Sequence, residues 1–516
     1  MATNQIDVER KLLILAIIFF PITNFRITLP ITDKVLSGFF LLIGLAISLY
    51  KLFLEQDKLD KFERFSLFYL LAYFVWQCIC CIVGVQEYAY YHLINLEQMD
   101  KLRVLLQELF RIGINFSDLT AIKAWFILVF IKSCIWNLFL TYSISFWVYH
   151  IYTKIKDSRK RIKRIFDDLI MAVTVLCIVL IIYSFFEIGY LRGNQFCAEL
   201  LKTINPYLYE PQQGVGWWPP LLWSGRLRSL FVEPSYLGVF GVLIVPVLFY
   251  KLLISKTVFF SMAYGMFMVM LFLTRSRLAI IIYLIQFSIL IVYLCLLNRV
   301  YLKNIIKVVF INIVSFGISI YLISGFATYS VSISDSPNIS EQNVVATYIN
   351  DNITSVIGKD KRSNSARYAA LRAAFLTGVE NPFYGVGMLP GAYICNHFTD
   401  EDLNDYEVKY TWVEYLNKLG PYKFNGPNCG QLFFELAKFG IVGLLFYLLP
   451  FIYFISFLLK TNKIWEHLSL ELACIIIAYI GSFISISNSL PFFVYYILTG
   501  FMLVSLQSIK EECSYV

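Results

Sequence analysis

Five arginines lie at or near the ends of apolar runs or in a long polar segment. They are Arg226, Arg228, Arg275, Arg277 and Arg367. Arg275 and Arg277 belong to a Thr-Arg-Ser-Arg sequence that interrupts an otherwise apolar run at 257–297. Arginine beside such a run is expected to be ion-paired, hydrated, extended to lipid headgroups or placed for function. Because a guanidinium donates two parallel hydrogen bonds to phosphate oxygens, converging arginines predict a phosphate or pyrophosphate ligand.

Glu233 is a candidate general base beside the first of these arginines. It directly precedes Pro234, a residue suited to the first turn of a helix, so an apolar span is expected to begin there. A partly desolvated carboxylate at this point can accept a proton as a general base. A pairing with Arg226 or Arg228, or an interaction with the helix dipole, would explain Glu233 without chemistry.

Asn428 and Glu435 are further candidates, in the sequence Gly-Pro-Asn-Cys-Gly-Gln-Leu-Phe-Phe-Glu at 426–435. There a polar segment runs into a later apolar run, as it does at Glu233. A pairing of Glu435 with Lys438 on one helix is the alternative explanation.

The other reactive residue types form no recognisable site. The sequence has no P-loop, no dinucleotide-type glycine pattern and no acidic metal cluster, so neither nucleotide-driven transport nor metal catalysis is predicted, and no cofactor is expected. The 11 cysteines lie mostly in apolar runs without zinc-site spacing and behave there as small hydrophobic residues. One polar segment is crowded with aromatic residues, which predict an aromatic belt at the membrane surface, with a platform for sugar rings as the alternative. They are Trp217, Trp218, Trp223, Tyr207 and Tyr209.

The elements that position these residues are membrane-spanning helices. The chain is 59% hydrophobic and only 15% charged, with a mean hydropathy of +0.67, which is too apolar for one soluble core. We expect about twelve spans, because that many apolar runs approach the ~20 residues needed to cross ~30 Å of hydrocarbon. The runs lie near 11–31, 35–54, 65–85, 121–152, 168–190, 235–256, 257–273, 278–297, 305–325, 439–459, 465–486 and 488–507. The first run lacks a cleavage site and is expected to be a retained span.

Loop charges predict the orientation of these spans. Lysine and arginine accumulate in every second loop, most densely at 154–164, and basic loops face the cytoplasm. Both termini are therefore expected in the cytoplasm. Binding of anionic lipid headgroups by the basic loops is the alternative explanation. The net charge of +8 thus requires no nucleic-acid partner.

Three longer polar segments fall on the opposite side, near 86–120, 191–234 and 326–438. The first contains a predicted amphipathic helix that would lie flat on the outer membrane surface. Its apolar face comprises Met99, Leu102, Leu106, Leu109 and Phe110. The third is the longest polar stretch, and function concentrates in long loops on one face. The chain thus divides into the first nine spans within 1–325, a large outer loop at 326–438 and the last three spans within 439–516.

Four segments, in this order, resemble motifs of the O-antigen ligase and Wzy-type polysaccharide polymerase superfamily. The stretch at 228–238 is similar to its arginine-containing segment before a central span, and 274–277 is similar to its Ser-Arg turn. Arg367, followed by Glu-Asn-Pro-Phe-Tyr-Gly-Val-Gly at 380–387, resembles the outer-loop arginine and the Asn-Pro-x-x-Gly-x-Gly signature. The segment at 428–443 resembles one that reads His-Asn, then Glu, then two glycines opening a span.

The resemblance covers about 225–445 and implies a GT-C-like glycosyltransferase fold at the outer face of a bacterial cytoplasmic (inner) membrane. The implied donor is an undecaprenyl-pyrophosphate-linked glycan, used without a metal. The implied site residues are Glu233 as base, Arg228 and Arg367 as catalytic groups, the five arginines as pyrophosphate ligands, and Asn428 and Glu435 as further candidates. Membrane lipids and a chain-length regulator protein are further candidate partners.

One departure decides between members of the superfamily. In the family pattern, ligases that transfer glycan to lipid A core have a His directly before the Asn. This chain has Pro427 before Asn428 instead. We therefore expect a polymerase that joins oligosaccharide repeat units of O-antigen or capsule, with ligase as the alternative. A lipid-linked oligosaccharide flippase is the alternative from a different class, but the long outer loop favours the enzyme.

Overall fold

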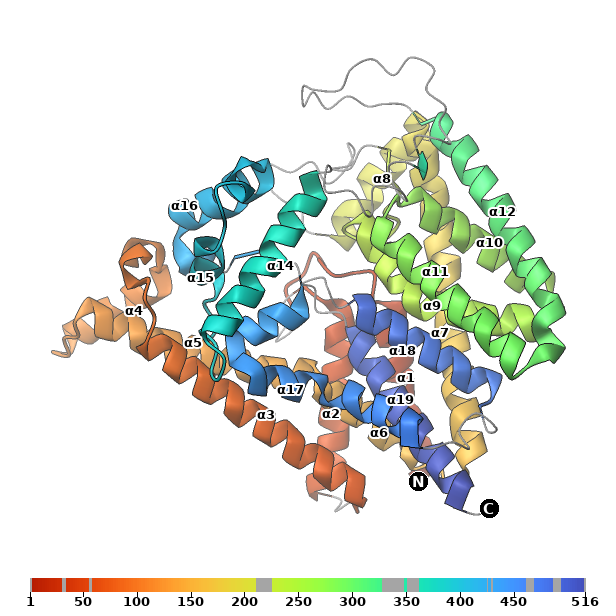
Figure 1. Ribbon diagram of the computed structural model, residues 1–516, viewed down its shortest axis with the longest axis horizontal. Coiled ribbons are helices and arrows are strands. Elements are labelled where there is room, and N and C mark those ends of the chain that lie inside the picture. Colours follow the sequence, from red (N-terminus) through yellow and green to blue (C-terminus); the bar gives the residue numbers. More distant parts are fainter. Residues whose placement is uncertain are drawn as a thin grey trace.

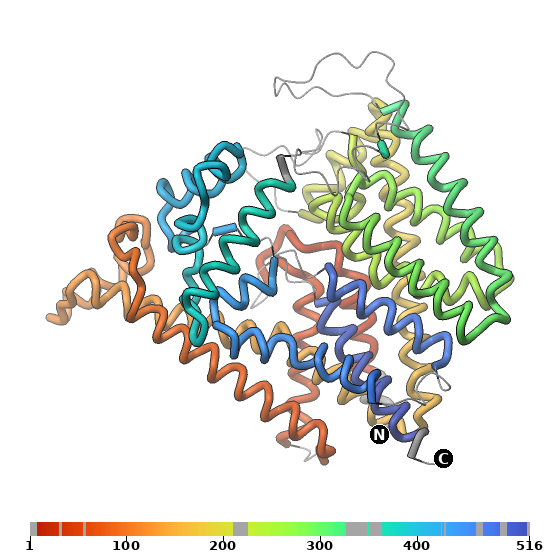
Figure 2. The backbone as a smooth tube through the Cα atoms, viewed as in Figure 1, coloured from red at the N-terminus to blue at the C-terminus, as the bar shows by residue number. Residues whose placement is uncertain are grey.

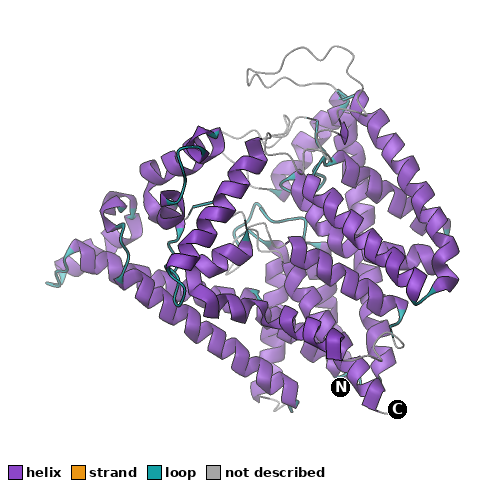
Figure 3. Cartoon of the chain, in the orientation of Figure 1, coloured by secondary structure: helices purple, strands orange, loops and turns teal. Residues whose placement is uncertain are grey.

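The computed structural model is helical throughout the part of the chain that it describes. That part comprises residues 2–29, 34–54, 58–209, 225–326, 348–349, 362–424, 426–427, 430–460, 468–485 and 493–514. Within these ranges the elements are helices joined by turns and loops, and none is a strand (Figure 3). The expectation of an all-α protein is confirmed.

Nine of the described helices are long and apolar enough to cross a membrane. They are α2 (Leu36–Leu54), α3 (Lys61–Gln86), α5 (Asp118–Leu140) continued by α6 (Tyr142–Thr153), α7 (Ser158–Leu191), α9 (Pro234–Ile254), α11 (Arg277–Leu296), η3 (Arg299–Tyr301) continued by α12 (Leu302–Ser324), α17 (Gln431–Lys460) and α19 (Phe493–Ser514). Two shorter apolar helices are α10 (Val258–Leu273) and α18 (Leu470–Ser485), and α1 (Ala2–Ile18) precedes the first of the nine. A helix of 16 residues, such as α10, covers roughly 24 Å, less than the ~30 Å of hydrocarbon. The polytopic membrane architecture is confirmed, and the figure of about twelve spans stays a prediction.

Two of the predicted runs differ from the helices observed. The run at 11–31 was expected to be one span, but α1 ends at Ile18 and the chain turns at 19–21. Pro21 cannot donate a backbone hydrogen bond, which explains why a helix does not continue through it. The run at 121–152 is broken at Thr141, whose ψ of −114° separates α5 from α6.

Four helices, α6, α9, α18 and α19, are buried along most of their length, and Figure 2 shows the course of the backbone through them. All residues of α9 at 237–249 are buried, which agrees with a helix that is apolar on all sides. Peripheral helices instead expose large apolar side chains, such as Phe68 of α3, Phe185 of α7 and Phe310 of α12. In a polytopic membrane protein these outward-facing side chains would contact lipid.

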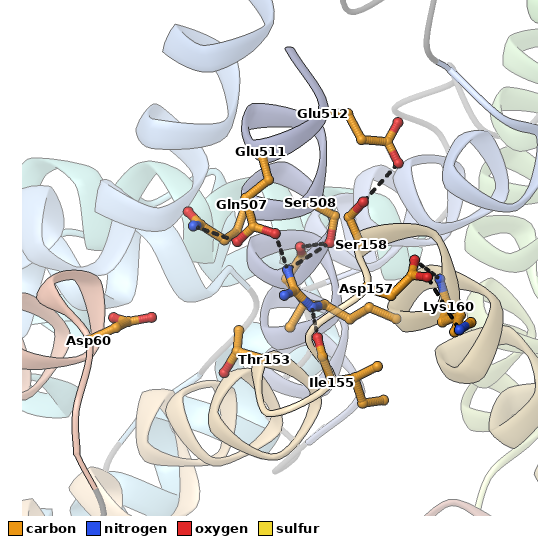
Figure 4. A network of polar contacts seen from close by, with 12 residues as sticks. Asp60, Thr153, Ile155, Asp157, Ser158, Lys160, Gln507, Ser508, Glu511 and Glu512 are labelled. Atoms are coloured by element: carbon orange, nitrogen blue, oxygen red, sulfur yellow. Dashed lines mark hydrogen bonds and ion pairs between the residues drawn. The ribbon is translucent and has the colours of Figure 1, made fainter. Parts of the chain in front are cut away.

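The two termini lie together at one end of the molecule (Figure 1). Arg161, from the basic run at 154–164, donates to the Ser508 hydroxyl at 3.1 Å and to the Glu511 carboxylate at 3.2 Å. Ser158 donates to Glu512 of the same C-terminal helix at 3.0 Å (Figure 4). The most basic run and both termini therefore share one end, and its assignment to the cytoplasm stays a prediction.

Buried ion pairs hold the helices together at this end. Arg10 of α1 donates two hydrogen bonds, of 2.6 and 2.7 Å, to Asp168 of α7, which also accepts one of 2.7 Å from the Tyr152 hydroxyl. Lys51 of α2 lies 2.7 Å from Glu9 of α1. Removing one partner of a buried pair leaves an uncompensated charge, so these contacts fix how the helices meet.

The helices outside the apolar spans lie largely at the other end, where Figure 1 shows α14, α15, α16 and α8 away from the termini. They are η1 (Tyr91–Leu93), η2 (Leu96–Gln98), α4 (Asp100–Arg111), α8 (Gln195–Leu208), α14 (Arg362–Glu380), α15 (Gly391–Asn396), η5 (Asp402–Asn404), the π-helix η6 (Glu407–Val413) and α16 (Glu414–Lys423). The predicted amphipathic helix is confirmed as α4. Met99 and Leu102 on its predicted apolar face are buried against the protein, whereas Phe110 is exposed.

Candidate functional site

Two of the arginine segments are joined directly by a backbone hydrogen bond. The Leu227 N–H, between Arg226 and Arg228, donates to the Leu273 carbonyl at 3.0 Å, and Leu273 ends α10 immediately before the Thr-Arg-Ser-Arg turn. A Cβ atom placed on Gly225 would lie 3.9 Å from Nη1 of Arg275. These two segments therefore lie side by side in the fold.

The turn between α10 and α11 is held by its own hydroxyl groups. The Ser276 N–H donates to the Thr274 hydroxyl oxygen at 3.1 Å, and the Ser276 side chain caps α11 by accepting from the Ala279 N–H at 3.4 Å. The hydrogen bonds of Thr274 and Ser276 stabilise a tight turn between the two helices. Arg275 and Arg277 consequently lie on either side of a helix N-cap.

Arg277 connects this turn to the outer helix that carries the fifth arginine. Its Nη1 donates to Oδ1 of Asn364 at 2.8 Å. Asn364 lies in the first turn of α14, three residues before Arg367, so the two residues share one side of that helix. Arg226, Arg275 and Arg277 are partly buried and Arg367 is exposed. Three segments that are far apart in the sequence therefore meet at one place.

Arg228 is the most enclosed of the five arginines, with 4% of its surface exposed. Its guanidinium donates to the Tyr183 hydroxyl at 3.4 Å and to the Phe231 carbonyl at 3.5 Å. It also lies over the ring of Tyr209, 5.7 Å from the centroid. Tyr209, expected to belong to an aromatic belt or sugar platform, is therefore buried against an arginine.

Glu187 of α7 holds the backbone at Arg228 and was not among the predicted site residues. One carboxylate oxygen accepts from the Arg228 N–H at 3.0 Å and the other accepts from the Ser229 N–H at 2.7 Å. Ser229 also shares a 2.8 Å hydrogen bond between its hydroxyl and that of Ser184. Glu187 could have been identified from the sequence because it is an acidic residue inside an apolar span. Such residues are as a rule functional or structurally paired.

Backbone strain coincides with this site. Within the described residues, Ser229 and Arg275 are the two non-glycine residues with positive φ, of 55° and 52°. Such conformations persist only where the surroundings impose them, and they concentrate at functional sites. Both lie in the paired arginine segments.

Glu233 lies directly before the start of a helix, as the sequence predicted. α9 begins at Pro234 with Glu233 as its N-cap residue, as expected. The Glu233 carboxylate is partly buried and accepts from the Ser235 hydroxyl at 3.2 Å. This contact leaves its role as a base a prediction.

Glu435 lies in the first half of α17 and is buried. It accepts from the Tyr73 hydroxyl at 3.2 Å and from the Gln431 amide at 2.7 Å. Lys438, its expected alternative partner, lies over the rings of Phe434 and Phe439, at 4.8 and 5.7 Å. The hydrogen bonds shown for Glu435 are thus with neutral groups. Asn428, Trp217, Trp218 and Trp223 lie outside the described residues.

The segment at 380–387, which follows α14, is a backbone joint with α17. The Val386 and Gly387 N–H groups donate to the carbonyls of Ala437 and Lys438 at 2.8 and 3.0 Å. The Ile441 N–H donates back to the Pro382 carbonyl at 2.7 Å. α17 is interrupted at Gly440, and this interruption leaves its backbone groups available for these bonds. The bonds hold α14, which carries Arg367, against the helix that carries Glu435.

Within the described residues, no three His, Cys, Asp or Glu side chains are grouped so as to hold a metal ion. The groups that the site offers a ligand are therefore guanidinium, hydroxyl, amide and carboxylate groups. Comparisons of the chain with protein-family models, with curated proteins and with solved structures found no match.

Proposed function

We propose that this protein is a polysaccharide polymerase that joins lipid-pyrophosphate-linked oligosaccharide repeat units at the outer face of a bacterial inner membrane. The observation that carries the proposal is the meeting of three arginine-bearing segments at one place. The Leu227–Leu273 hydrogen bond joins the first two segments, and the Arg277–Asn364 contact brings in the third. Arginine is the side chain best suited to bind a pyrophosphate through paired hydrogen bonds.

The chemistry proposed for this site is glycosyl transfer without a metal. An acceptor hydroxyl oxygen attacks the anomeric carbon of the donor sugar, and the bond from that carbon to the pyrophosphate oxygen breaks. Glu233 is the candidate base that takes the hydroxyl proton. The lipid pyrophosphate leaves with the bonding electron pair, and the arginines stabilise the charge that develops on it.

The arginines divide by their accessibility into two proposed roles. Arg226, Arg275, Arg277 and Arg367 are partly or fully exposed and are the candidates for direct contact with the pyrophosphate. Arg228 is enclosed by its tyrosine neighbours and acts as a buried positive charge at the same place. Held in position before the substrate arrives, such groups need little reorganisation during the reaction.

The proposal is tested in a strain that lacks this chain and is complemented with variants. Arg277→Ala should lower the amount of polymer by roughly 100-fold or more, the loss typical of one charge-stabilising donor. Arg277→Lys should restore polymer poorly, because an ammonium cannot make the paired hydrogen bonds of a guanidinium. Arg103→Ala is the matched control, since Arg103 is an exposed arginine of α4 with one partner, Asp100, at 3.4 Å. Normal polymer from Arg277→Ala at normal abundance would remove the proposed site.

The product separates the polymerase from the two alternatives. Loss of a polymerase in an O-antigen strain should leave lipid A core capped with a single repeat, and in a capsule strain short lipid-linked units. Loss of a ligase should leave uncapped core while long lipid-linked chains accumulate. Loss of a flippase should leave repeat units on the cytoplasmic side. Uncapped core with accumulated polymer would replace polymerase by ligase and leave the arginine site in place.

A further inference from the structure

A cavity lies far from the arginines, between the helices at the terminal end of the molecule. It has a volume of about 300 Å³ and is lined by residues of α3, α6, α17 and α19. Phe62, Phe65 and Tyr69 of α3, Tyr149 of α6, and Leu449 and Tyr453 of α17 are among the residues that line it. Asp60, which caps α3, lies at the same end as Glu511 and Glu512 of the C-terminal helix (Figure 4).

Several hydroxyl groups in the wall of this cavity are hydrogen-bonded to the protein backbone. The Ser66 and Tyr69 hydroxyls donate to the carbonyls of Phe62 and Phe446, at 2.9 and 2.7 Å. The Ser145 hydroxyl likewise donates to the Tyr496 carbonyl at 2.7 Å. Because these hydroxyls are already bonded to backbone carbonyls and the other lining side chains are largely apolar, the interior suits a hydrocarbon rather than water or a polar ligand.

The cavity opens sideways between two helices that are suited to cross the membrane. Phe65 of α3 is 57% exposed, and Leu449 and Tyr453 of α17 are each 37% exposed, although all three line the cavity. Exposed apolar side chains on a membrane-spanning helix face lipid. A hydrocarbon chain can therefore enter from the bilayer without crossing a polar surface.

Basic residues lie beside this opening, in the first turns of α3. Lys61 and Arg64 are exposed and are the direct chain neighbours of the lining residues Phe62 and Phe65. Within the described residues neither has an ion-pair partner. Of the two carboxylates at this turn, Glu63 is buried and lies 2.7 Å from Nδ1 of His150, so it is turned away from the surface. Asp60 caps the helix by accepting from the Glu63 N–H at 2.7 Å.

We propose that this cavity binds one acyl chain of an anionic phospholipid whose phosphate lies against Lys61 and Arg64. The apolar wall and lateral opening select a lipid tail, and the two cations select a negatively charged headgroup. The site lies at the opposite end of the molecule from the arginine turns, so this lipid is distinct from the proposed sugar donor. The proposal does not depend on the proposed enzymatic activity.

Lipid binding to the purified full-length chain, in an uncharged detergent, tests the headgroup assignment. Native mass spectrometry would compare phosphatidylglycerol with phosphatidylcholine carrying the same acyl chains. The wild type should bind phosphatidylglycerol roughly tenfold or more tightly, as two cations near a membrane surface imply. Lys61→Gln combined with Arg64→Gln should abolish this preference, whereas Lys101→Gln combined with Arg103→Gln on α4, with the same change in net charge, should keep it. Equal binding of both lipids by the wild type would overturn the anionic headgroup.

Filling the cavity tests the position of the acyl chain. Ser66→Phe places a ring at the opening and removes only a hydrogen bond within one helix turn. It should weaken binding of both lipids, and Leu503→Phe, at another part of the wall, provides a second filled variant should the first fail to fold. A filled variant that folds and binds phosphatidylglycerol like the wild type would overturn the cavity as the site of the tail.

Discussion

At the scale of single residues, one serine and one arginine with a strained backbone mark the candidate site. Ser229 and Arg275 both adopt the left-handed conformation, which disfavours side chains by roughly 1–2 kcal/mol per residue. Ser229 is held by Glu187, and Arg275 adjoins the segment that pairs with Leu227. The surrounding contacts thus impose conformations on both segments that neither would adopt alone.

Glu187→Gln should disturb the arginine segment directly. The carboxylate accepts from two N–H groups, whereas an amide has one oxygen and presents its NH₂ group to the second donor. An unsatisfied buried group of this kind costs about 1–3 kcal/mol, so the thermal unfolding midpoint in detergent should fall. Polymer should also fall in cells that contain normal amounts of the protein, because Arg228 is displaced.

Glu199→Gln is the control for this change, because Glu199 is exposed on α8 and pairs with Lys202 at 2.7 Å within one helix turn. An exposed pair of this kind contributes little to stability, so the control should behave as the wild type. If Glu187→Gln has the same thermal unfolding midpoint and makes the same amount of polymer as Glu199→Gln, the positioning role of Glu187 is wrong.

At the scale of elements, the break in α17 matters most, because it joins that helix to the loop after α14. Gly440 has a φ of +66°, and a Cβ atom there would lie 2.1 Å from the carbonyl oxygen of Phe383. The glycine allows the loop backbone to approach the helix closely. The Asn-Pro-x-x-Gly-x-Gly segment therefore acts as a structural joint.

Gly440→Ala should be strongly destabilising. The left-handed backbone and the contact with Phe383 together should cost roughly 2–4 kcal/mol, which a lower thermal unfolding midpoint would report. Gly317→Ala in α12 is the matched change, because a Cβ atom there meets nothing within 4 Å. In that helix interior alanine should be neutral or slightly stabilising. Equal midpoints for the two variants would contradict the joint.

At the scale of the whole molecule, the chain separates into a terminal end and an end that carries the outer helices. The contacts of Arg161 tie the basic run to the C-terminal helix at one end, and α14 to α16 lie at the other (Figure 1). Exposed apolar side chains lie on the helices between them. This arrangement predicts that the two ends face opposite sides of the membrane.

Single introduced cysteines should be labelled from opposite sides of intact cells. Lys160→Cys should react with a thiol reagent only after the membrane is made permeable, and Glu401→Cys should react without that step. The native Cys395 in α15 should contribute little background at neutral pH, because burial raises the pKa of its thiol to about 12 and the reactive thiolate is scarce. Labelling of both introduced cysteines from one side would contradict the orientation.

The sequence by itself determined the class of the protein and the local beginnings and ends of its elements. Hydropathy located the apolar runs from which the long helices form, since a span is a property of a continuous run of residues, but it did not reveal the end of α1 at Ile18 or the break at Thr141. Pro234 marked the start of α9, and the spacing of apolar residues marked α4, because proline geometry and helical periodicity are local. The sequence also indicated which arginines lie unusually close to apolar runs.

Only the tertiary structure decided how those elements meet. The Leu227–Leu273 pairing, the contact of Arg277 with Asn364 and the support of Arg228 by Glu187 join residues that are distant in the chain. The break of α17 at Gly440 and the cavity beside α3 likewise depend on neighbours from other helices. Such contacts follow from packing between elements, to which neither hydropathy nor helical periodicity is sensitive.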